Sequence, residues 1–320
     1  FIAALFASKS IFGSVIVLRL IIILADIGIL YVGKKLLEKL NLPNKNIFWY
    51  ILNPFIIIEM TGNLHFEPVM LFFFMFGIYK LYQQKWILAA MLIGCSISVK
   101  LIPLLFLPLF FQWFVCKKNP RKDQLMSVQA QSRTLNLLRL TSFYVISILT
   151  FIILFLPFLS STLIANYSKS VGLWFGKFEF NASFYYIFRE IGYLFRGYNE
   201  IAIIGKITPI LTILILMILT FFNKNTSLKQ LFTAMLFALC FYYFTATTVH
   251  PWYLATPIIL SVFTKYKFPI VWSLVIILSY QAYANTPWQE NLWFVALEYI
   301  VVFSYIFYEI RRFRRKKLIN

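Results

Sequence analysis

The sequence predicts an all-α, polytopic integral membrane protein with about eleven transmembrane or re-entrant helices, in a single domain over residues 1–320. Hydrophobic residues make up 61% of the chain and charged residues only 13%, whereas soluble domains are roughly 45–50% apolar. The apolar residues gather in runs close to the length that crosses a bilayer. Basic residues lie in the breaks between these runs, mostly on one side.

Each apolar run is taken as one helix. The shortest, 47–61, 86–99 and 252–264, fall below the roughly 17 residues needed to cross a bilayer alone, so half-spanning or re-entrant helices are expected there. The predicted helices cover residues 11–32, 47–61, 67–82, 86–99, 101–115, 140–158, 199–222, 231–248, 252–264, 268–284 and 292–309.

If each predicted helix crosses the bilayer once, every loop is assigned to one side, and so are its Lys and Arg residues. Of the 30, 22 fall on one side, which the positive-inside rule makes cytoplasmic. The loops expected to face outward are 62–66, the turn at Lys100, 159–198, 248–252 and 285–291. The remaining basic residues lie in spans or on the outer side: Lys9, Arg19, Lys100, Lys169, Lys177, Arg189, Arg196 and Lys206.

The charge of +19 would suggest nucleic acid binding in a soluble protein. Here the basic residues flank apolar runs and fit contact with anionic membrane lipids, so no nucleic acid partner is expected. Cys95, Cys116 and Cys240 form no CxxC pair, so neither a disulfide framework nor a metal site is expected. The loop 116–139 is polar and basic and is predicted to be a cytoplasmic linker.

The densest polar cluster is NPFIIIEMTGNLHFEP, residues 53–68. Glu59, Asn63 and Glu67 are spaced at i, i+4 and i+8 and share a face if the helix continues, with His65 between them. Such groups at the end of a half-helix suit hydroxyl or phosphate binding. The alternative is a helix-end cap with interfacial polar residues.

Lys100 interrupts ISVKLIPLLFLP between two short apolar segments. Its ammonium group can pair with the headgroup of a bilayer lipid or hold the phosphate of a bound donor. Nearer the start of the sequence, Asp26 lies mid-span with Arg19 two turns earlier. These two are expected to pair with each other or with neighbouring helices.

A second cluster, TTVHPWYLATP, covers residues 247–257. His250 precedes Pro251, which restricts it to an extended backbone and breaks the helix. Trp252 and Tyr253 are either aromatic belt residues or a stacking surface for a sugar or a polyprenyl chain.

The loop 159–198 is rich in aromatic residues and is predicted to contain an amphipathic helix in the membrane interface. Glu179 and Asn181 are its candidate acceptor ligands.

Three of these motifs together resemble bacterial membrane mannosyltransferases of the GT-C superfamily, near glycosyltransferase family 87. They are residues 53–109, GKFEFNASFYYIFREIGY and VHPWYL. The resemblance implies transfer of a hexose, expected to be mannose, from a polyprenyl-phosphate donor to a lipid or glycan acceptor. It also implies the bacterial cytoplasmic (inner) membrane, with the active site on the extracytoplasmic face. No cofactor besides this donor substrate is implied, and dependence on a divalent metal is left open.

By this resemblance His250 and Lys100 hold the donor phosphate. Glu59, Asn63, His65 and Glu67 shape the sugar or acceptor pocket, with Glu179, Asn181, Trp252 and Tyr253 as further members. His250, Lys100 and His65 are expected to converge in one pocket.

The catalytic base is not identified. The family's base is an Asp in the first outer loop, and the chain, which opens on Phe1, is expected to lack that helix and loop. Glu67 is a weak substitute, and the chain as given is expected to be inactive if the base lies upstream. A polyprenyl-lipid flippase or small-solute transporter is the alternative, although it would place more charges in mid-span.

Overall fold

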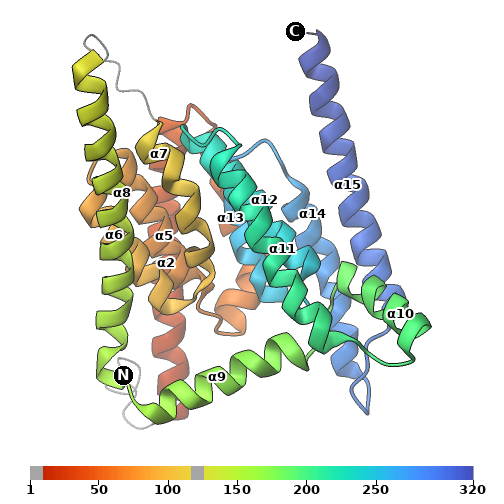
Figure 1. Ribbon diagram of the computed structural model, residues 1–320. Coiled ribbons are helices and arrows are strands. Elements are labelled where there is room, and N and C mark those ends of the chain that lie inside the picture. The colour runs from red at the N-terminus through yellow and green to blue at the C-terminus, as the bar shows by residue number, and fades with distance from the viewer. Residues whose placement is uncertain (1–9, 117–125, 320) are drawn as a thin grey trace. The chain divides into compact units, whose positions relative to one another are not determined.

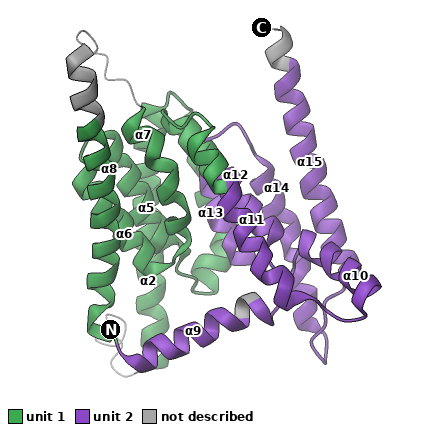
Figure 2. Ribbon diagram, viewed as in Figure 1, with its two compact units in different colours: residues 1–159, 216–235 green, residues 160–215, 236–320 purple. Residues whose placement is uncertain are grey.

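The computed structural model describes residues 10–116 and 126–319 (Figure 1). They form two compact units (Figure 2). Unit 1 comprises residues 1–159 and 216–235, and unit 2 comprises residues 160–215 and 236–320. Every named element in the described ranges is helical, and the one extended pairing there is an isolated parallel bridge between Phe180 and Thr248. That the chain is a single membrane domain stays a prediction.

Unit 1 is built on an antiparallel helix pair, α5 and α6, flanked by α2 on one side and α8 on the other. Its elements are α2 (Ile11–Lys39), η1 (Asn44–Ile47), α3 (Phe48–Ile51), α4 (Pro54–Ile56), η2 (Ile57–Gly62), α5 (Glu67–Tyr82), α6 (Trp86–Val99), η3 (Ile102–Phe110), α7 (Phe111–Val115), α8 (Met126–Phe155) and η4 (Leu156–Phe158).

Small residues let α6 approach α8 closely. A Cβ atom on Gly94 would lie 2.6 Å from the carbonyl oxygen of Ser147 and 2.6 Å from Cβ of Thr150. The Ser147 hydroxyl donates across the interface to the carbonyl of Ala90 at 3.1 Å. Lipid tails are as apolar as the side chains, so this backbone approach and hydrogen bond carry much of the association of the two helices.

Unit 2 places α14 against α13 and α15. Its elements are α9 (Ser161–Gly176), α10 (Phe184–Arg196), η5 (Pro251–Leu254), α13 (Ala255–Val262), α14 (Phe268–Val275), η6 (Ile276–Ala284) and α15 (Leu292–Ile319). Two further helices, α11 (Ile201–Phe221) and α12 (Leu228–Thr245), are divided between the units.

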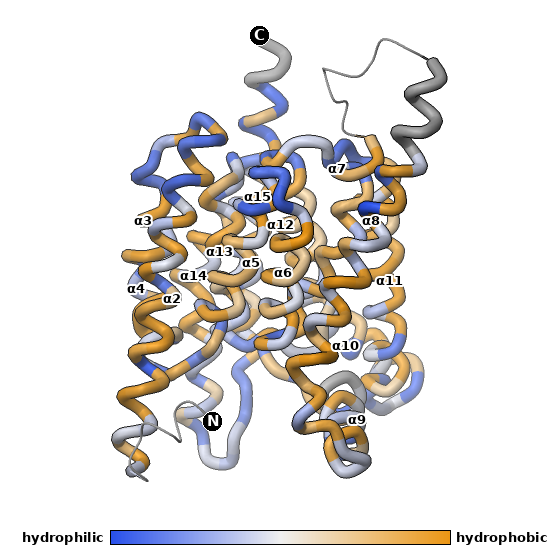
Figure 3. Tube along the Cα trace, turned by 90° about the vertical axis from the view of Figure 1, so that its left-hand side faces the viewer, coloured by the Kyte–Doolittle hydropathy of each residue, from blue (hydrophilic) through white to orange (hydrophobic). Residues whose placement is uncertain are grey.

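Five helices within the described ranges are long and apolar enough to cross a membrane, which confirms the all-α polytopic fold. Only 17% of the most apolar stretch of Thr134–Phe158 is buried in the protein, so lipid must cover the rest. Figure 3 shows hydrophobic residues along the helices and hydrophilic ones mainly in the turns. The spans are Ile11–Lys39, Thr134–Phe158, Ile201–Phe221, Leu228–Thr245 and Leu292–Arg315.

The short apolar segments remain short in the structure, and the predicted helix 47–61 is divided among η1, α3, α4 and η2. That these segments half-span the bilayer stays a prediction. Pro54–Gly62 and Glu67–Tyr82 meet at a bend of 112° and form a broken span or a re-entrant loop. Four more apolar helices have only 10–17 residues each: Trp86–Val99, Ile102–Val115, Pro251–Val262 and Phe268–Ala284.

The predicted linker 116–139 is wrong in its second half. Residues 117–125 lie outside the described residues, but α8 already begins at Met126. The segment has no Gly or Pro and contains Ala, Gln, Leu and Arg, which favour helix. Hydropathy detects the apolar part of a helix and misses such a polar extension.

The loop 159–198, predicted to contain an amphipathic helix, contains two helices, α9 and α10. Their place in the membrane interface stays a prediction. Ser160 caps α9 through a hydrogen bond from the amide of Leu163 at 3.0 Å. Gly197 ends α10 in the left-handed conformation, with φ of 76°, which glycine adopts without strain.

Candidate functional site

The polar cluster of unit 1 is built where the chain leaves η2. The Asn53 side chain caps α4 by accepting from the amide of Phe55 at 3.0 Å, and the helix then widens to π geometry over Ile57–Gly62. Leu64 takes a left-handed backbone, with φ of 60°, before α5 begins at Glu67. Glu67 therefore lies beyond the bend, and the expected common helical face ends at Asn63.

Glu59 and Asn63 do interact as their spacing predicts. The Asn63 amide donates to a carboxylate oxygen of the buried Glu59 at 3.1 Å. Arg19 of α2 donates to the carbonyls of Thr61 and Gly62 at 3.0 and 3.2 Å, and so satisfies carbonyl groups at the end of η2. Of the two pairings expected for Arg19, the structure has the one with a neighbouring helix.

His65 is uncharged at neutral pH. Burial, and secondly the charge of Lys100, lower the pKa of His65 from its usual 6.5 to about 4. Its Nε2 lies 3.9 Å from Glu59 Oε2, a distance that would suit an ion pair only if the ring were protonated. We therefore regard His65 as a neutral imidazole, which can donate one hydrogen bond and accept one.

Lys100 contacts Glu67 directly, with its ammonium group on the carboxylate. Glu67 begins α5 and Lys100 follows the last residue of α6, so the antiparallel pairing brings both to the end of the hairpin opposite the turn at residues 83–85. Glu67 is fully buried, whereas the Lys100 side chain is 30% exposed. The carboxylate fixes the ammonium group and leaves part of it accessible.

In unit 2, two sequence motifs lie side by side. The amide of Phe180 donates to the carbonyl of Thr247 at 3.1 Å, and the amide of Val249 donates to the carbonyl of Phe180 at 2.9 Å. The Thr248 hydroxyl donates to the carbonyl of Phe178 at 3.1 Å. These bonds hold the segment after α9 against the segment before η5.

The result is an aromatic cage around His250, formed by Phe178, Phe180, Trp252 and Tyr253. The imidazole stacks on Trp252 with ring centres 4.4 Å apart and an angle of 7°, and lies 5.1 Å from Phe180 and 6.1 Å from Phe178. Tyr253 meets it edge-on at 5.5 Å. His250 is 5% exposed, and its backbone is extended as the following proline predicts.

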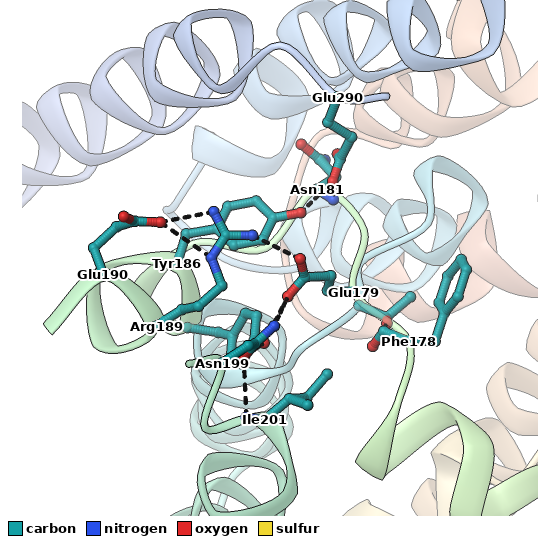
Figure 4. Close-up of polar contacts among 11 residues, drawn as sticks. Phe178, Glu179, Asn181, Tyr186, Arg189, Glu190, Asn199, Ile201 and Glu290 are labelled. Carbon is teal, nitrogen blue, oxygen red and sulfur yellow. Dashed lines mark hydrogen bonds and ion pairs between the residues drawn. The ribbon is translucent and has the colours of Figure 1, made fainter. Parts of the chain in front are cut away.

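Glu179 lies at the centre of a hydrogen-bond network (Figure 4). Its carboxylate accepts from the Arg189 guanidinium at 2.6 Å, from the Tyr185 hydroxyl at 2.6 Å and from the Asn199 amide at 3.2 Å. Arg189 also donates to Glu190 at 2.8 Å. Burial lowers the pKa of Arg189, but the bonds to Glu190 and Glu179 outweigh it and the net pKa is raised.

Asn181 is fully buried and connects its own segment to the loop before α15 and to α15 itself. Its amide N–H donates to Glu290 at 2.7 Å and its side chain donates to Glu298 at 3.2 Å. Its carbonyl accepts from the Tyr299 hydroxyl at 2.7 Å. Glu290 also accepts from the Tyr186 hydroxyl, and burial raises the pKa of Glu290.

The sequence-predicted residues thus fall into two groups. Unit 1 holds Glu59, Asn63, His65, Glu67 and Lys100, and unit 2 holds Glu179, Asn181, His250, Trp252 and Tyr253. The structure brings together the members within each group. Convergence of the two groups stays a prediction, as do the ligands assigned to each residue.

Sequence reasoning missed the residues that fix these groups in place. Arg189, Asn199, Tyr186 and Glu290 hold the segment around Glu179 and Asn181, and their partners lie up to 109 positions away. For Glu290, the only sequence signal was its place in the predicted outer loop 285–291. In the described part of the chain, no group of three or more His, Cys, Asp or Glu side chains could hold a metal ion.

Comparison with protein families gives one match. Residues 1–117, a little over a third of the chain, match the family model described as "Alpha-(1->6)-mannopyranosyltransferase, N-terminal domain". The match includes all five residues of the unit 1 group and supports the resemblance to GT-C-like bacterial mannosyltransferases. Kinship with glycosyltransferase family 87 stays a prediction. No curated protein and no solved structure matches.

Proposed function

We propose that this chain, whose first 117 residues match a mannopyranosyltransferase N-terminal domain, belongs to a GT-C-like bacterial mannosyltransferase of the inner membrane. The reaction is transfer of mannose from a polyprenyl-phosphate donor to a lipid or glycan acceptor at the extracytoplasmic face. The family match is the observation that carries the proposal. The unit 1 polar group lies within the matched residues and supports it.

The chemistry requires two kinds of assistance. An acceptor hydroxyl attacks the anomeric carbon of the sugar, the bond from that carbon to the phosphate oxygen breaks, and polyprenyl phosphate leaves with the bonding electrons. A general base takes the hydroxyl proton. Positive or hydrogen-bonding groups must stabilise the charge that develops on the leaving phosphate.

From the sequence motifs, Lys100 of unit 1 and His250 of unit 2 are each assigned as a contact of the leaving phosphate. Support for Lys100 comes from its ammonium group, which is held by the buried carboxylate of Glu67 and remains 30% exposed. Support for His250 comes from the cage, in which Trp252 and Phe180 orient the imidazole by stacking. A ring that is fixed before the donor binds loses little entropy when it binds.

Glu59, Asn63 and His65 of unit 1 are assigned to the sugar or the acceptor, and Trp252 and Tyr253 of unit 2 are assigned as stacking surfaces. Glu179 is partly exposed and fits a contact role, whereas the fully buried Asn181 fits the role of holding the segment in place. Glu67 is paired with Lys100 and fully buried, so we do not assign it as the base.

The test is transfer by the full-length protein in nanodiscs from radiolabelled polyprenyl-phosphate mannose. His250→Phe keeps a ring for stacking and removes both nitrogens, so we expect transfer to fall about 100-fold or more with an unchanged thermal midpoint. His250→Ala removes the ring as well and therefore also loses the stacking on Trp252 and Phe180, so comparing the two variants separates the role of the nitrogens from that of the ring.

Unchanged turnover in both variants would remove the phosphate assignment of His250. Uptake of a solute by proteoliposomes, without sugar transfer, would support the transporter in place of the enzyme.

A further inference from the structure

A polar pocket lies in unit 2 between the end of η6 and the start of α15. Its volume is about 580 Å³, and no residue assigned so far except Glu290 of the network borders it. We call it the 281–293 pocket. It is lined by Gln281, Asn285, Thr286, Pro287, Gln289, Glu290, Asn291, Leu292 and Trp293.

We propose that the 281–293 pocket binds a neutral saccharide. Four of its lining side chains are amides, and Thr286 and Glu290 add a hydroxyl and a carboxylate. Amides offer donors and acceptors together, which matches hydroxyl groups that do the same. The lining includes no Lys, Arg or His, the side chains that anion sites use, and the carboxylate of Glu290 repels phosphate.

One lining group is short of a partner. The Nε2 atom of Gln281 is buried and has no hydrogen-bond acceptor among the described residues. Its other terminal atom, Oε1, accepts at 3.4 Å from the Asn285 amide, which also donates to the carbonyls of Gln289 at 2.6 Å and Gln281 at 3.2 Å. A buried N–H group without an acceptor is costly, and rotation of the Gln281 side chain toward the pocket would let a ligand hydroxyl supply the missing acceptor.

Trp293 provides a flat apolar surface at the edge of the same pocket. It is 84% exposed, so the indole can cover the C–H face of a pyranose while the amides bind its hydroxyls. An exposed Trp can also be a membrane-interface anchor, and binding measurements on a Trp293 variant separate these two roles.

The loop that forms the pocket contacts the segments that carry the His250 cage. Trp288, within the same loop, lies 6.3 Å from Phe178 and 6.2 Å from Phe180 between ring centres, and both Phe rings flank His250. Glu290 accepts from the amide of Asn181, next to Phe180. The loop that forms the pocket is therefore joined to the His250 cage through Trp288 and Glu290. On the proposed function, the saccharide in the pocket is the sugar acceptor.

The experiment measures binding of a fluorescent α-linked mannotriose to the full-length protein in nanodiscs by anisotropy. Trp293→Ala should weaken binding about tenfold or more, because a Trp side chain that the bound ligand covers contributes much of the binding energy. Gln281→Leu, which keeps the shape and removes the amide, should weaken it about three- to tenfold. Trp49→Ala is the matched control, because Trp49 is an exposed Trp of unit 1 at 53% exposure, and it should bind as the wild type does.

A second probe tests whether the pocket prefers an uncharged saccharide, as proposed. The same trisaccharide carrying a 6-phosphate should bind no more tightly than the uncharged one. Tighter binding of the phosphorylated probe, or Trp293→Ala affinity within twofold of wild type, would overturn the site.

The transfer assay keeps this inference separate from the proposed function. Saccharide binding that depends on Trp293 and Gln281, in a protein that transfers no mannose, supports the pocket and removes the enzyme. Mannose transfer that Trp293→Ala and Gln281→Leu leave unchanged, with mannotriose binding equally unchanged, supports the enzyme and removes the pocket.

Discussion

At the scale of residues, the ion pair between Glu67 and Lys100 is the interaction best explained by the cost of burying a charge. A fully buried carboxylate is costly in a low-dielectric environment unless a cation and hydrogen bonds accompany it. The sequence showed both residues as unusual but separated by 33 positions, and only the α5/α6 hairpin brings them together. The residue types were predictable, whereas the pair was not.

Removing one partner of this pair should destabilise the protein. Lys100→Met leaves the Glu67 carboxylate buried without a cation, and we expect a loss of about 3–5 kcal/mol in unfolding free energy. The double variant Glu67→Gln/Lys100→Met should recover most of that loss because no buried charge remains. Denaturant unfolding in detergent of the wild type, both single variants and the double variant measures the coupling. Additive effects of the two substitutions would contradict the pairing.

His65 should make stability depend on pH. Its pKa is about 4 in the folded protein, below its usual 6.5, so between these values the unfolded chain binds a proton that the folded chain does not. Stability is then fully present above about pH 6.5 and falls as pH falls toward about 4. In His65→Gln the thermal midpoint should depend less on pH across this window. The same pH dependence in both proteins would show that His65 is not buried as described.

At the scale of elements, hydropathy predicted most of the helices well. The segments 67–82 and 86–99 agree with α5 and α6 at both ends, since each is bounded by polar or helix-breaking residues. The polar start of α8 and the polar end of α2 were missed because helical propensity there does not follow hydropathy. The bridge between Phe180 and Thr248 was also beyond prediction, because it depends on packing between segments nearly 70 positions apart.

Two helical glycines should respond in opposite ways to alanine. Gly94→Ala places a methyl group against the Ser147 carbonyl and Thr150 of α8, so we expect a loss of about 1–3 kcal/mol from overpacking. Gly172→Ala in α9 meets nothing within 4 Å and should gain about 0.5–1 kcal/mol from the lower entropy of the unfolded chain. Thermal and denaturant unfolding compare both variants with the wild type. A neutral Gly94→Ala would mean that α6 and α8 pack less closely.

For the whole molecule, the distribution of charge is the feature that sequence reveals best. The positive-inside rule needs only loop composition, so the cytoplasmic side can be predicted without contacts. Within unit 1 the α5/α6 hairpin places Lys80 and Lys85 at the end with the turn and Glu67 and Lys100 at the other. Which end faces the cytoplasm stays a prediction. Tertiary interactions between distant segments, such as Asn181 with Glu290, cannot be inferred from composition.

Cysteine labelling tests this orientation. In a background without Cys95, Cys116 and Cys240, Gln84→Cys in the α5/α6 turn should react with an impermeant maleimide only in inside-out vesicles. Asn285→Cys in the loop before α15 should react only in right-side-out vesicles, because it is predicted on the outer side. Reaction of both positions from one side would show that the number of membrane crossings predicted between them is wrong.

The most direct test of the account is the donor preference of the purified full-length protein. Equal amounts of radiolabelled polyprenyl-phosphate mannose and of nucleotide-diphosphate mannose are offered separately, and label transferred to acceptor is counted. We predict transfer from the polyprenyl-phosphate donor alone. Transfer from the nucleotide donor alone would contradict the account.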